Sequence, residues 1–195
     1  MAKVAVVYHS GYGHTKKLAE AVTAGAASVS GTETTLLSVD DLPRDAPAWA
    51  TLDAADAIIF GAPTYMGSYS AQFKGFIDLA AYRWASQAWK DKLAAGFTNS
   101  GSFSGDKLNT LQSLCVNAML HSMIWVGLGL MPVQTEDPHG PRLEDLNRLG
   151  SFMGAMSAAA QAGPDAAPAS GDLKTGEHLG KRVATLAAQL EKSKA

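Results

Sequence analysis

Residues 4–15 read VAVVYHSGYGHT, an apolar run of five residues followed by a polar turn that contains two glycines. A continuous run of this length is typical of a strand buried on both faces, as strands of parallel sheets are. The glycines let the backbone approach an anion, and the amides of a following helix N-terminus attract negative charge. The stretch therefore predicts a buried strand, a phosphate-binding turn and a helix that begins near Thr15.

Strands and helices alternate along the rest of the chain. Besides Val4–Tyr8, the expected strands are Thr34–Val39, Asp56–Gly61, Leu93–Thr98 and Ile124–Leu128. The expected helices are Thr15–Val29, Ser70–Tyr82, Lys107–Ser122 and a C-terminal helix marked by Leu179, Val183, Leu186 and Leu190. This alternation favours an open parallel sheet with right-handed crossovers and with helices on both of its faces.

Composition is that of a globular protein of one domain. The 195 residues are 47% hydrophobic and 17% charged, with a net charge of −2, so we expect a single domain over residues 1–195. No basic stripe supports nucleic-acid binding, and the lone cysteine, Cys115, excludes an intramolecular disulfide and a cysteine-rich metal site. No apolar run reaches the ~18 residues of a membrane span, and we expect no signal peptide. A cytoplasmic protein without a membrane partner is the expectation.

The segment from Met131 to Asp172 departs from the alternating pattern. It is rich in proline, glycine and alanine and gives no clear helix or strand. Irregular segments longer than ~15 residues are uncommon in compact domains and are usually functional or disordered. We expect an irregular arm at about residues 131–172, which either covers the functional site or a subunit partner, or is a flexible insertion.

Three polar loops follow the first, third and fourth expected strands: Ser10–Thr15, Ala62–Ser70 and Asn99–Gly105. Loops that follow parallel strands lie at the carboxyl edge of the sheet, where α/β proteins bind their ligands. The first loop is neither a Walker loop nor a dinucleotide fingerprint, because its glycine spacing and its ending differ from both. The three loops together predict a planar, phosphorylated ligand.

The motifs in these loops resemble those of the flavodoxin-like FMN proteins. They are Ser-x-Tyr-Gly-His-Thr after the first strand, Gly-x-Pro-Thr-Tyr-x-Gly after the third, and a Gly/Ser loop after the fourth. Within this class the chain is similar to the WrbA-type NAD(P)H:quinone oxidoreductases, through Ala2–Val4, Trp84–Ser86, His121 and Leu179–Ala184. The resemblance implies a flavodoxin-like, doubly wound, five-stranded parallel sheet of order 2-1-3-4-5.

The resemblance also assigns roles to residues. The FMN phosphate and ribityl chain would bind at Ser10, Gly11, Tyr12, Gly13, His14 and Thr15. The flavin ring would lie against Pro63, Thr64, Tyr65, Met66, Gly67, Asn99, Ser100, Gly101, Ser102, Phe103 and Ser104. Trp84 would line the substrate pocket, and His121 would contact the quinone or the flavin, with His121 and Tyr12 as catalytic residues. A homo-oligomer, tetramer or dimer, is implied as well.

The activity that these expectations imply is transfer of two electrons, as hydride, from NAD(P)H through FMN to quinones. A flavodoxin-type electron carrier and another NAD(P)H-dependent FMN reductase remain alternatives. No Asp or Glu occurs in the three loops, and Asp106 is the first acid after them. Neutral loops beside a helix N-terminus oppose a reduced, anionic flavin less than acidic loops would, which favours two-electron chemistry.

Overall fold

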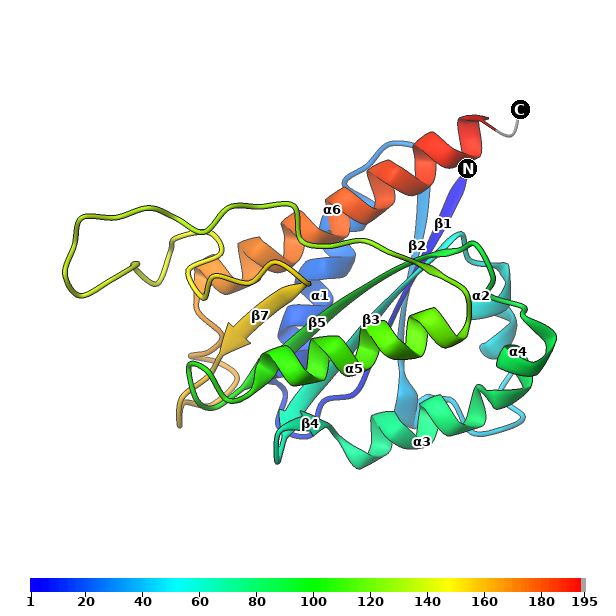
Figure 1. Cartoon of the computed structure of the whole chain (residues 1–195), viewed down its shortest axis with the longest axis horizontal. Helices are drawn as coiled ribbons and strands as arrows, with labels where there is room; N and C mark the ends of the chain where they lie inside the picture. Colours follow the sequence, from blue (N-terminus) through cyan, green and yellow to red (C-terminus); the bar gives the residue numbers. More distant parts are fainter. Residues whose placement is uncertain (194–195) are drawn as a thin grey trace.

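The chain folds into a parallel sheet between two layers of helices, as a computed structural model of residues 1–193 shows (Figure 1). The strands β1 (Ala2–Tyr8), β2 (Thr32–Ser38), β3 (Ala57–Tyr65), β5 (Leu93–Ser100) and β6 (Ile124–Trp125) pair in the order β2-β1-β3-β5-β6. Every pair along this path is parallel. By position this is the expected order 2-1-3-4-5, so the predicted flavodoxin-like fold is confirmed. The short β4 (Ser68–Tyr69) forms an antiparallel hairpin with the end of β3.

The fifth strand position differs from the prediction. β6 ends at Trp125 and pairs only with the beginning of β5, whereas β7 (Ala155–Ala158) pairs with the end of β5. The predicted strand Ile124–Leu128 is therefore too long, and the segment thought to lack regular structure contains a strand. The reason is local composition: β7 reads AMSA, and small residues carry little strand preference of their own.

Two helices cover one face of the sheet and four cover the other. α1 (His14–Ala27) and α6 (Ser170–Ser193) pack with the apolar residues of one face, including Val4 and Val6. α2 (Trp49–Ala54), α3 (Ala71–Leu79), α4 (Ala81–Ser86) and α5 (Lys107–Leu120) lie on the opposite side, against Ala5 and Val7 (Figure 1). The residues of β1 alternate between these two cores, which explains why its sequence is apolar throughout.

The helix boundaries also correct three expectations. The predicted helix Ser70–Tyr82 is two helices, α3 and α4, and Ser70 is the N-cap whose hydroxyl accepts a bond from the Phe73 amide. α6 begins at Ser170, inside the predicted arm, and α2 was not predicted. α1 and α6 pack so closely that a Cβ atom at Gly180 would come within 1.9 Å of the Val22 carbonyl oxygen.

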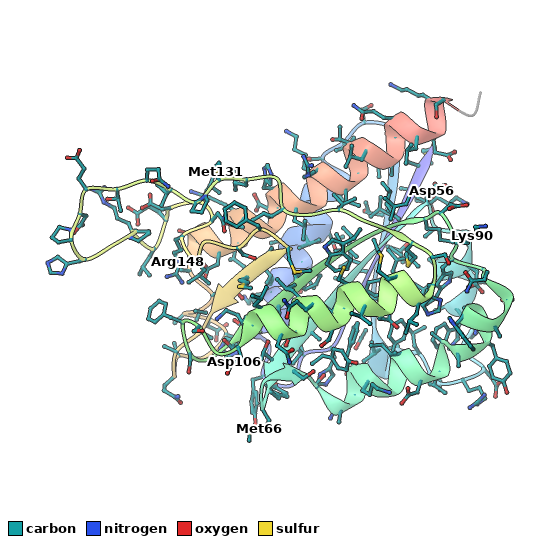
Figure 2. The ribbon with its side chains drawn as sticks, viewed as in Figure 1. Asp56, Met66, Lys90, Asp106, Met131 and Arg148 are labelled. Atoms are coloured by element: carbon teal, nitrogen blue, oxygen red, sulfur yellow. The ribbon has the colours of Figure 1, made fainter. Side chains whose placement is uncertain are left out.

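The irregular arm spans the residues between β6 and β7. Its two ends lie side by side, where the Leu128 amide donates a hydrogen bond to the Phe152 carbonyl oxygen at 2.8 Å. Arg148 forms a bidentate ion pair with Asp172, at 2.7 and 2.8 Å, and this fixes the returning end of the arm to α6. Figure 2 labels Met131 and Arg148 on the arm, which extends past the first turns of α6. Among residues 1–193, no helix has the length and apolar character needed to cross a membrane.

Candidate functional site

A cavity of about 440 Å³ opens at the carboxyl edge of the sheet. All three predicted loops line it, together with one segment that was not predicted. The lining residues are Tyr12, His14, Thr15, Pro63, Thr64, Tyr65, Asn99, Ser100, Gly101 and residues 159–164. No Asp, Glu, Lys or Arg lines this cavity, so its wall is formed by backbone, hydroxyl, amide, imidazole and aromatic groups.

The first loop is built to receive an anion. The Ser10 hydroxyl oxygen accepts bonds from the amides of Gly13 and Lys16, each at 3.1 Å, which folds the loop around the start of α1. Gly13 holds φ at 90°, in the left-handed region that favours glycine. Within residues 1–193, nothing accepts a bond from the amides of His14 and Thr15. These free donors at a helix N-terminus suit a phosphate.

Two tyrosines stand at this loop. The Tyr12 and Tyr65 rings meet edge to face, with centroids 6.0 Å apart, and Tyr12 is largely exposed. Burial, followed by the nearby Tyr12, raises the pKa of Tyr65, while a hydrogen bond with the Gly11 backbone lowers it. Met66 comes next at φ 48° and is fully exposed at the tip of the hairpin (Figure 2). The second loop therefore offers the Tyr65 side chain to the cavity and not that of Met66.

The threonine of the second loop serves the fold as well as the cavity. The Thr64 hydroxyl lies 2.8 Å from the hydroxyl of Thr98 in β5 and 2.8 Å from that of Thr110 in α5. All three groups are buried. This triad ties the second loop to β5 and α5, so the wall formed by Thr64 has a fixed position.

The third loop divides between the cavity and the surface. Asn99, Ser100 and Gly101 line the cavity, and the Asn99 side-chain oxygen accepts a bond from the Ser157 hydroxyl at 2.8 Å. Ser102, Phe103 and Ser104 are exposed and lie outside the cavity lining, so their contact with the flavin ring stays a prediction. Ser10, Gly11, Gly13, Met66 and Gly67 also lie outside the cavity lining, and Ser10 and Gly13 shape the first loop.

Residues 159–164 form a strap over the first loop that sequence reasoning missed. His14 Nε2 lies 2.8 Å from the Ala162 carbonyl oxygen, and a side chain on Gly13 would come within 3.0 Å of Pro164. The strap reads AAQAGP and follows β7 directly. No pattern in its composition marks a binding segment. Its position became visible only once β7 was placed beside β5.

His121 and Trp84 do not reach the cavity of their own chain. α5 begins at Lys107 beside the cavity and runs about 21 Å, at ~1.5 Å per residue, before it ends next to His121. His121 is 2% exposed, and its ring packs against that of Trp89 at a tilt of 31°, with centroids 4.5 Å apart. Its Nδ1 has no partner among the described residues. Burial lowers its pKa. One chain therefore does not bring these two residues to this cavity, and the roles expected for them stay predictions.

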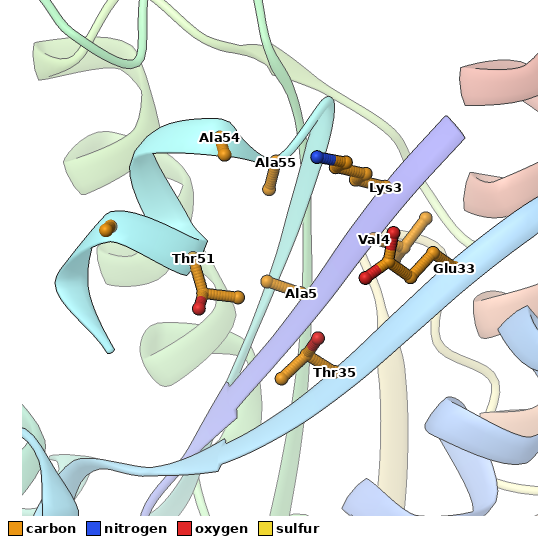
Figure 3. A pocket seen from close by; sticks show the side chains of 9 residues that line it. Lys3, Val4, Ala5, Glu33, Thr35, Thr51, Ala54 and Ala55 are labelled. Atoms are coloured by element: carbon orange, nitrogen blue, oxygen red, sulfur yellow. The ribbon is translucent and has the colours of Figure 1, made fainter. Parts of the chain in front are cut away.

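Other hollows lack such donors. One of about 260 Å³ lies at the amino end of the sheet, between β1, β2 and α2 (Figure 3). Lys3, Glu33, Thr35 and Thr51 line it together with small side chains. Its lining contains no glycine, and the amides of Ala50 and Thr51 in the first turn of α2 already donate to the carbonyl oxygens of Pro47 and Ala48. No group of three or more His, Cys, Asp or Glu within residues 1–193 could hold a metal ion.

The carboxyl-edge cavity fits FMN by its chemistry: free helix N-terminal amides for a dianionic phosphate, and an uncharged wall for a flat ring. The fold and this site together define a flavodoxin-like protein. The chain belongs to the NADPH-dependent FMN reductase family, whose model matches residues 2–134. The expected cofactors, FMN with NAD(P)H as donor, are thereby confirmed at the level of the family.

Individual relatives span nearly the whole chain. The flavodoxin FldP of Pseudomonas aeruginosa is 42% identical over 193 residues, which cover 97% of this chain and 99% of that protein. An NAD(P)H dehydrogenase (quinone) of Archaeoglobus fulgidus is 33% identical, covering 97% of this chain and 100% of its own length. The crystal structure of a WrbA-like flavodoxin from Agrobacterium tumefaciens matches with a TM-score of 0.75 and 41% identity, covering 97% and 99% of the two chains.

Proposed function

We propose that this protein is an FMN-dependent oxidoreductase that transfers two electrons, as hydride, from NAD(P)H to quinones. The observation that carries the proposal is the cavity wall at the carboxyl edge, which contains no carboxylate. Reduction of a bound FMN by hydride would give its ring a negative charge. Carboxylates close to the ring would repel that charge, and their absence from the lining leaves the fully reduced flavin accessible.

In this proposal the first loop holds the FMN phosphate, and the other two loops hold the ring. The amides of His14 and Thr15 would bind phosphate oxygens, in a loop fixed by the Ser10 hydroxyl. Asn99 and Ser100 would border the ring, with Asn99 held by Ser157. When bound, FMN supplies the capacity to accept a hydride and to pass on both electrons.

The chain's own residues control access to that ring. Tyr12 and Tyr65 present aromatic surface beside the first loop, and a flat nicotinamide or quinone can stack on such surface. The strap of residues 159–164 lines the cavity beside the first loop and would shield a bound ring from water there. Donor and acceptor would use the one open side in turn, in a ping-pong order.

The roles of Trp84 and His121, and the homo-oligomer, form part of the same proposal. Val116, Met119 and Leu120 are exposed apolar residues on one face of α5, near the end where His121 lies. A neighbouring subunit that covers this face would place Trp84 and His121 close to another chain. Light scattering of the purified protein tests this directly, since a monomer would remove both residues from the site. A cytoplasmic location is proposed with the activity.

The decisive experiment compares donors and acceptors. Purified protein is expected to be yellow and to release FMN on denaturation. Steady-state assays with NADH or NADPH and benzoquinone should show parallel-line kinetics, as a ping-pong order requires. Rapid FMN reduction without any quinone turnover would refute the quinone activity and would indicate another FMN reductase.

An electron carrier is the second candidate, and the 42% identical relative named as a flavodoxin favours it. A carrier passes electrons singly to a protein partner and reacts slowly with NAD(P)H itself. Titration with dithionite, followed by absorbance, separates the two. We expect one spectral step from oxidised to fully reduced flavin. Two well-separated steps, together with negligible NAD(P)H oxidation, would establish the carrier instead.

A further inference from the structure

Lys107 is a buried cation behind the third loop. It is 1% exposed and lies at the first position of α5. Its Nζ donates to the Ser100 hydroxyl oxygen at 2.7 Å and to the carbonyl oxygens of Ser102 and Phe103 at 2.8 and 2.7 Å. The loop of residues 100–105 is thus folded around a single ammonium group, and every N–H of that ammonium has an acceptor.

The charge of this ammonium is poorly compensated. A lysine at a helix N-terminus faces the positive end of the helix dipole, and no described carboxylate forms a salt bridge with it. Asp172, whose charge raises the pKa of Lys107, is already paired with Arg148. Burial lowers the pKa of Lys107 to about 8, with Asp172 raising it and Arg148 lowering it. A nearby anion would therefore be strongly favoured.

The Ser100 hydroxyl group lies between Lys107 and the cavity. Ser100 lines the cavity, and its hydroxyl accepts the bond from Lys107. One hydroxyl group thus separates the ammonium from the uncharged wall. The Ser100 hydroxyl also donates to the Ser102 carbonyl at 2.8 Å, which fixes it between the lysine and the cavity.

We propose that Lys107 is a positioning residue of the flavin site whose buried charge makes the protein bind reduced FMN more tightly than oxidised FMN. The inference rests on the proposed function only in placing FMN in this cavity. Hydride transfer from NAD(P)H yields NAD(P)⁺ and adds two electrons and one proton to the flavin. The ring therefore gains one negative charge unless water supplies a second proton, and Lys107 supplies the opposite charge through the third loop.

The test separates charge from shape with two variants. Lys107→Gln keeps amide donors for the loop but removes the charge, and Lys107→Met removes both. In a reductive titration of the FMN-loaded proteins against a reference dye, we expect Lys107→Gln to reduce the preference for reduced over oxidised FMN at least tenfold. That change lowers the two-electron midpoint potential by about 30 mV. The control is Lys90→Gln. It replaces an exposed lysine far from the cavity (Figure 2) and should leave the potential unchanged.

An unchanged potential in Lys107→Gln, with weaker binding of oxidised FMN in Lys107→Met, would overturn the proposal and leave Lys107 as a support for the loop. If both variants fail to fold, the wild-type protein gives the answer. The difference between its potential and that of free FMN should fall as the pH rises past the pKa of Lys107, about 8 in the protein without FMN, because a neutral amine no longer favours the reduced ring. A difference that stays constant to pH 9.5 would refute the charge effect. Neither measurement uses a quinone or NAD(P)H, so a protein without quinone activity can still confirm or refute this inference.

Discussion

The Nε2 atom of His14 lies 2.8 Å from the carbonyl oxygen of Ala162, which joins the first loop to a residue 148 positions later in the chain. This bond holds the strap over the first turn of α1. Replacing His14 by Ala removes it and costs about 1 kcal/mol. We expect FMN to dissociate about fivefold faster, as measured by the fluorescence of released FMN in stopped flow. His139→Ala, an exposed change on the arm, should leave the rate unaltered, and equal rates in all three proteins would contradict the role of the strap.

Ser10→Ala removes the oxygen that accepts bonds from the Gly13 and Lys16 amides. Loss of this acceptor costs about 1–2 kcal/mol, comparable to loss of a helix N-cap, because two amides at the start of the helix lose their partner. Binding of FMN, measured by calorimetric titration of the apoprotein, should weaken about tenfold or more. Ser113→Ala, whose hydroxyl bonds back to the Asn109 carbonyl on the exposed side of α5, is the matched control. Tight binding by Ser10→Ala would show that the loop keeps its shape without this acceptor.

Two glycines should respond in opposite directions to the same substitution. Gly13→Ala forces alanine to φ 90° and brings its Cβ within 3.0 Å of Pro164, so we expect a loss of about 1–2 kcal/mol in the free energy of unfolding. Gly75 lies inside α3, and a Cβ atom added there would meet no neighbouring atom within 4 Å. Gly75→Ala should therefore raise the free energy of unfolding by about 0.5–1 kcal/mol. Urea unfolding of the apoproteins measures both. Equal effects of the two changes would contradict the strained turn.

Arg148→Ala leaves Asp172 buried without its partner. The Asp172 carboxylate also accepts a bond from the Ala158 amide at 3.1 Å, so the pair links the arm, β7 and α6. Breaking a buried pair of this kind costs about 3–5 kcal/mol. The exposed pair between Lys74 and Asp78 provides the comparison, and Lys74→Ala should change stability by less than about 0.5 kcal/mol. Similar losses for the two variants, in urea unfolding, would refute this account of the arm.

His121 should make stability depend on pH. Burial lowers its pKa from the usual 6.5, so the folded state binds fewer protons than the unfolded state. Its contribution to stability is complete above pH 6.5 and is lost as the pH falls through the lower, folded value. His9 acts in the same direction, since burial lowers its pKa although Asp40 raises it. His121→Phe keeps a ring against Trp89 and should reduce the fall in unfolding free energy between pH 7.5 and 5.5. An unchanged fall would show that His121 does not contribute.

The elements that the sequence predicted well carry their signal locally. β1 is an unbroken apolar run that both cores require, and the first loop combines glycines and hydroxyls next to a helix start. These features depend on neighbours in the chain. The same is true of the polar loops after β3 and β5, which the parallel topology brings to one edge.

The features that sequence reasoning missed depend on distant contacts. The small residues of β7 form a strand only because the end of β5 offers an open edge. The strap lines the cavity because β7 precedes it, and Lys107 is indistinguishable from a surface lysine until the third loop folds over it. Trp84 and His121 were assigned by resemblance. His121 follows the end of α5 that lies away from the cavity, Trp84 lies in α4, and neither residue lines the cavity. The roles proposed for them require contacts that one chain does not make.

The fifth strand position is split between β6 and β7, so the length of the arm can change without changing the register of the sheet. Trp125 pairs with Ala94, Ala155 pairs with Phe97, and the chain between them leaves and returns at almost the same point. Lengthening a closed excursion costs little, about 0.6 kcal/mol for each doubling. The arm can therefore gain, lose or exchange residues while the flavin edge keeps its register. A circularly permuted protein, opened in the turn at residues 137–140, should consequently still fold and still turn yellow.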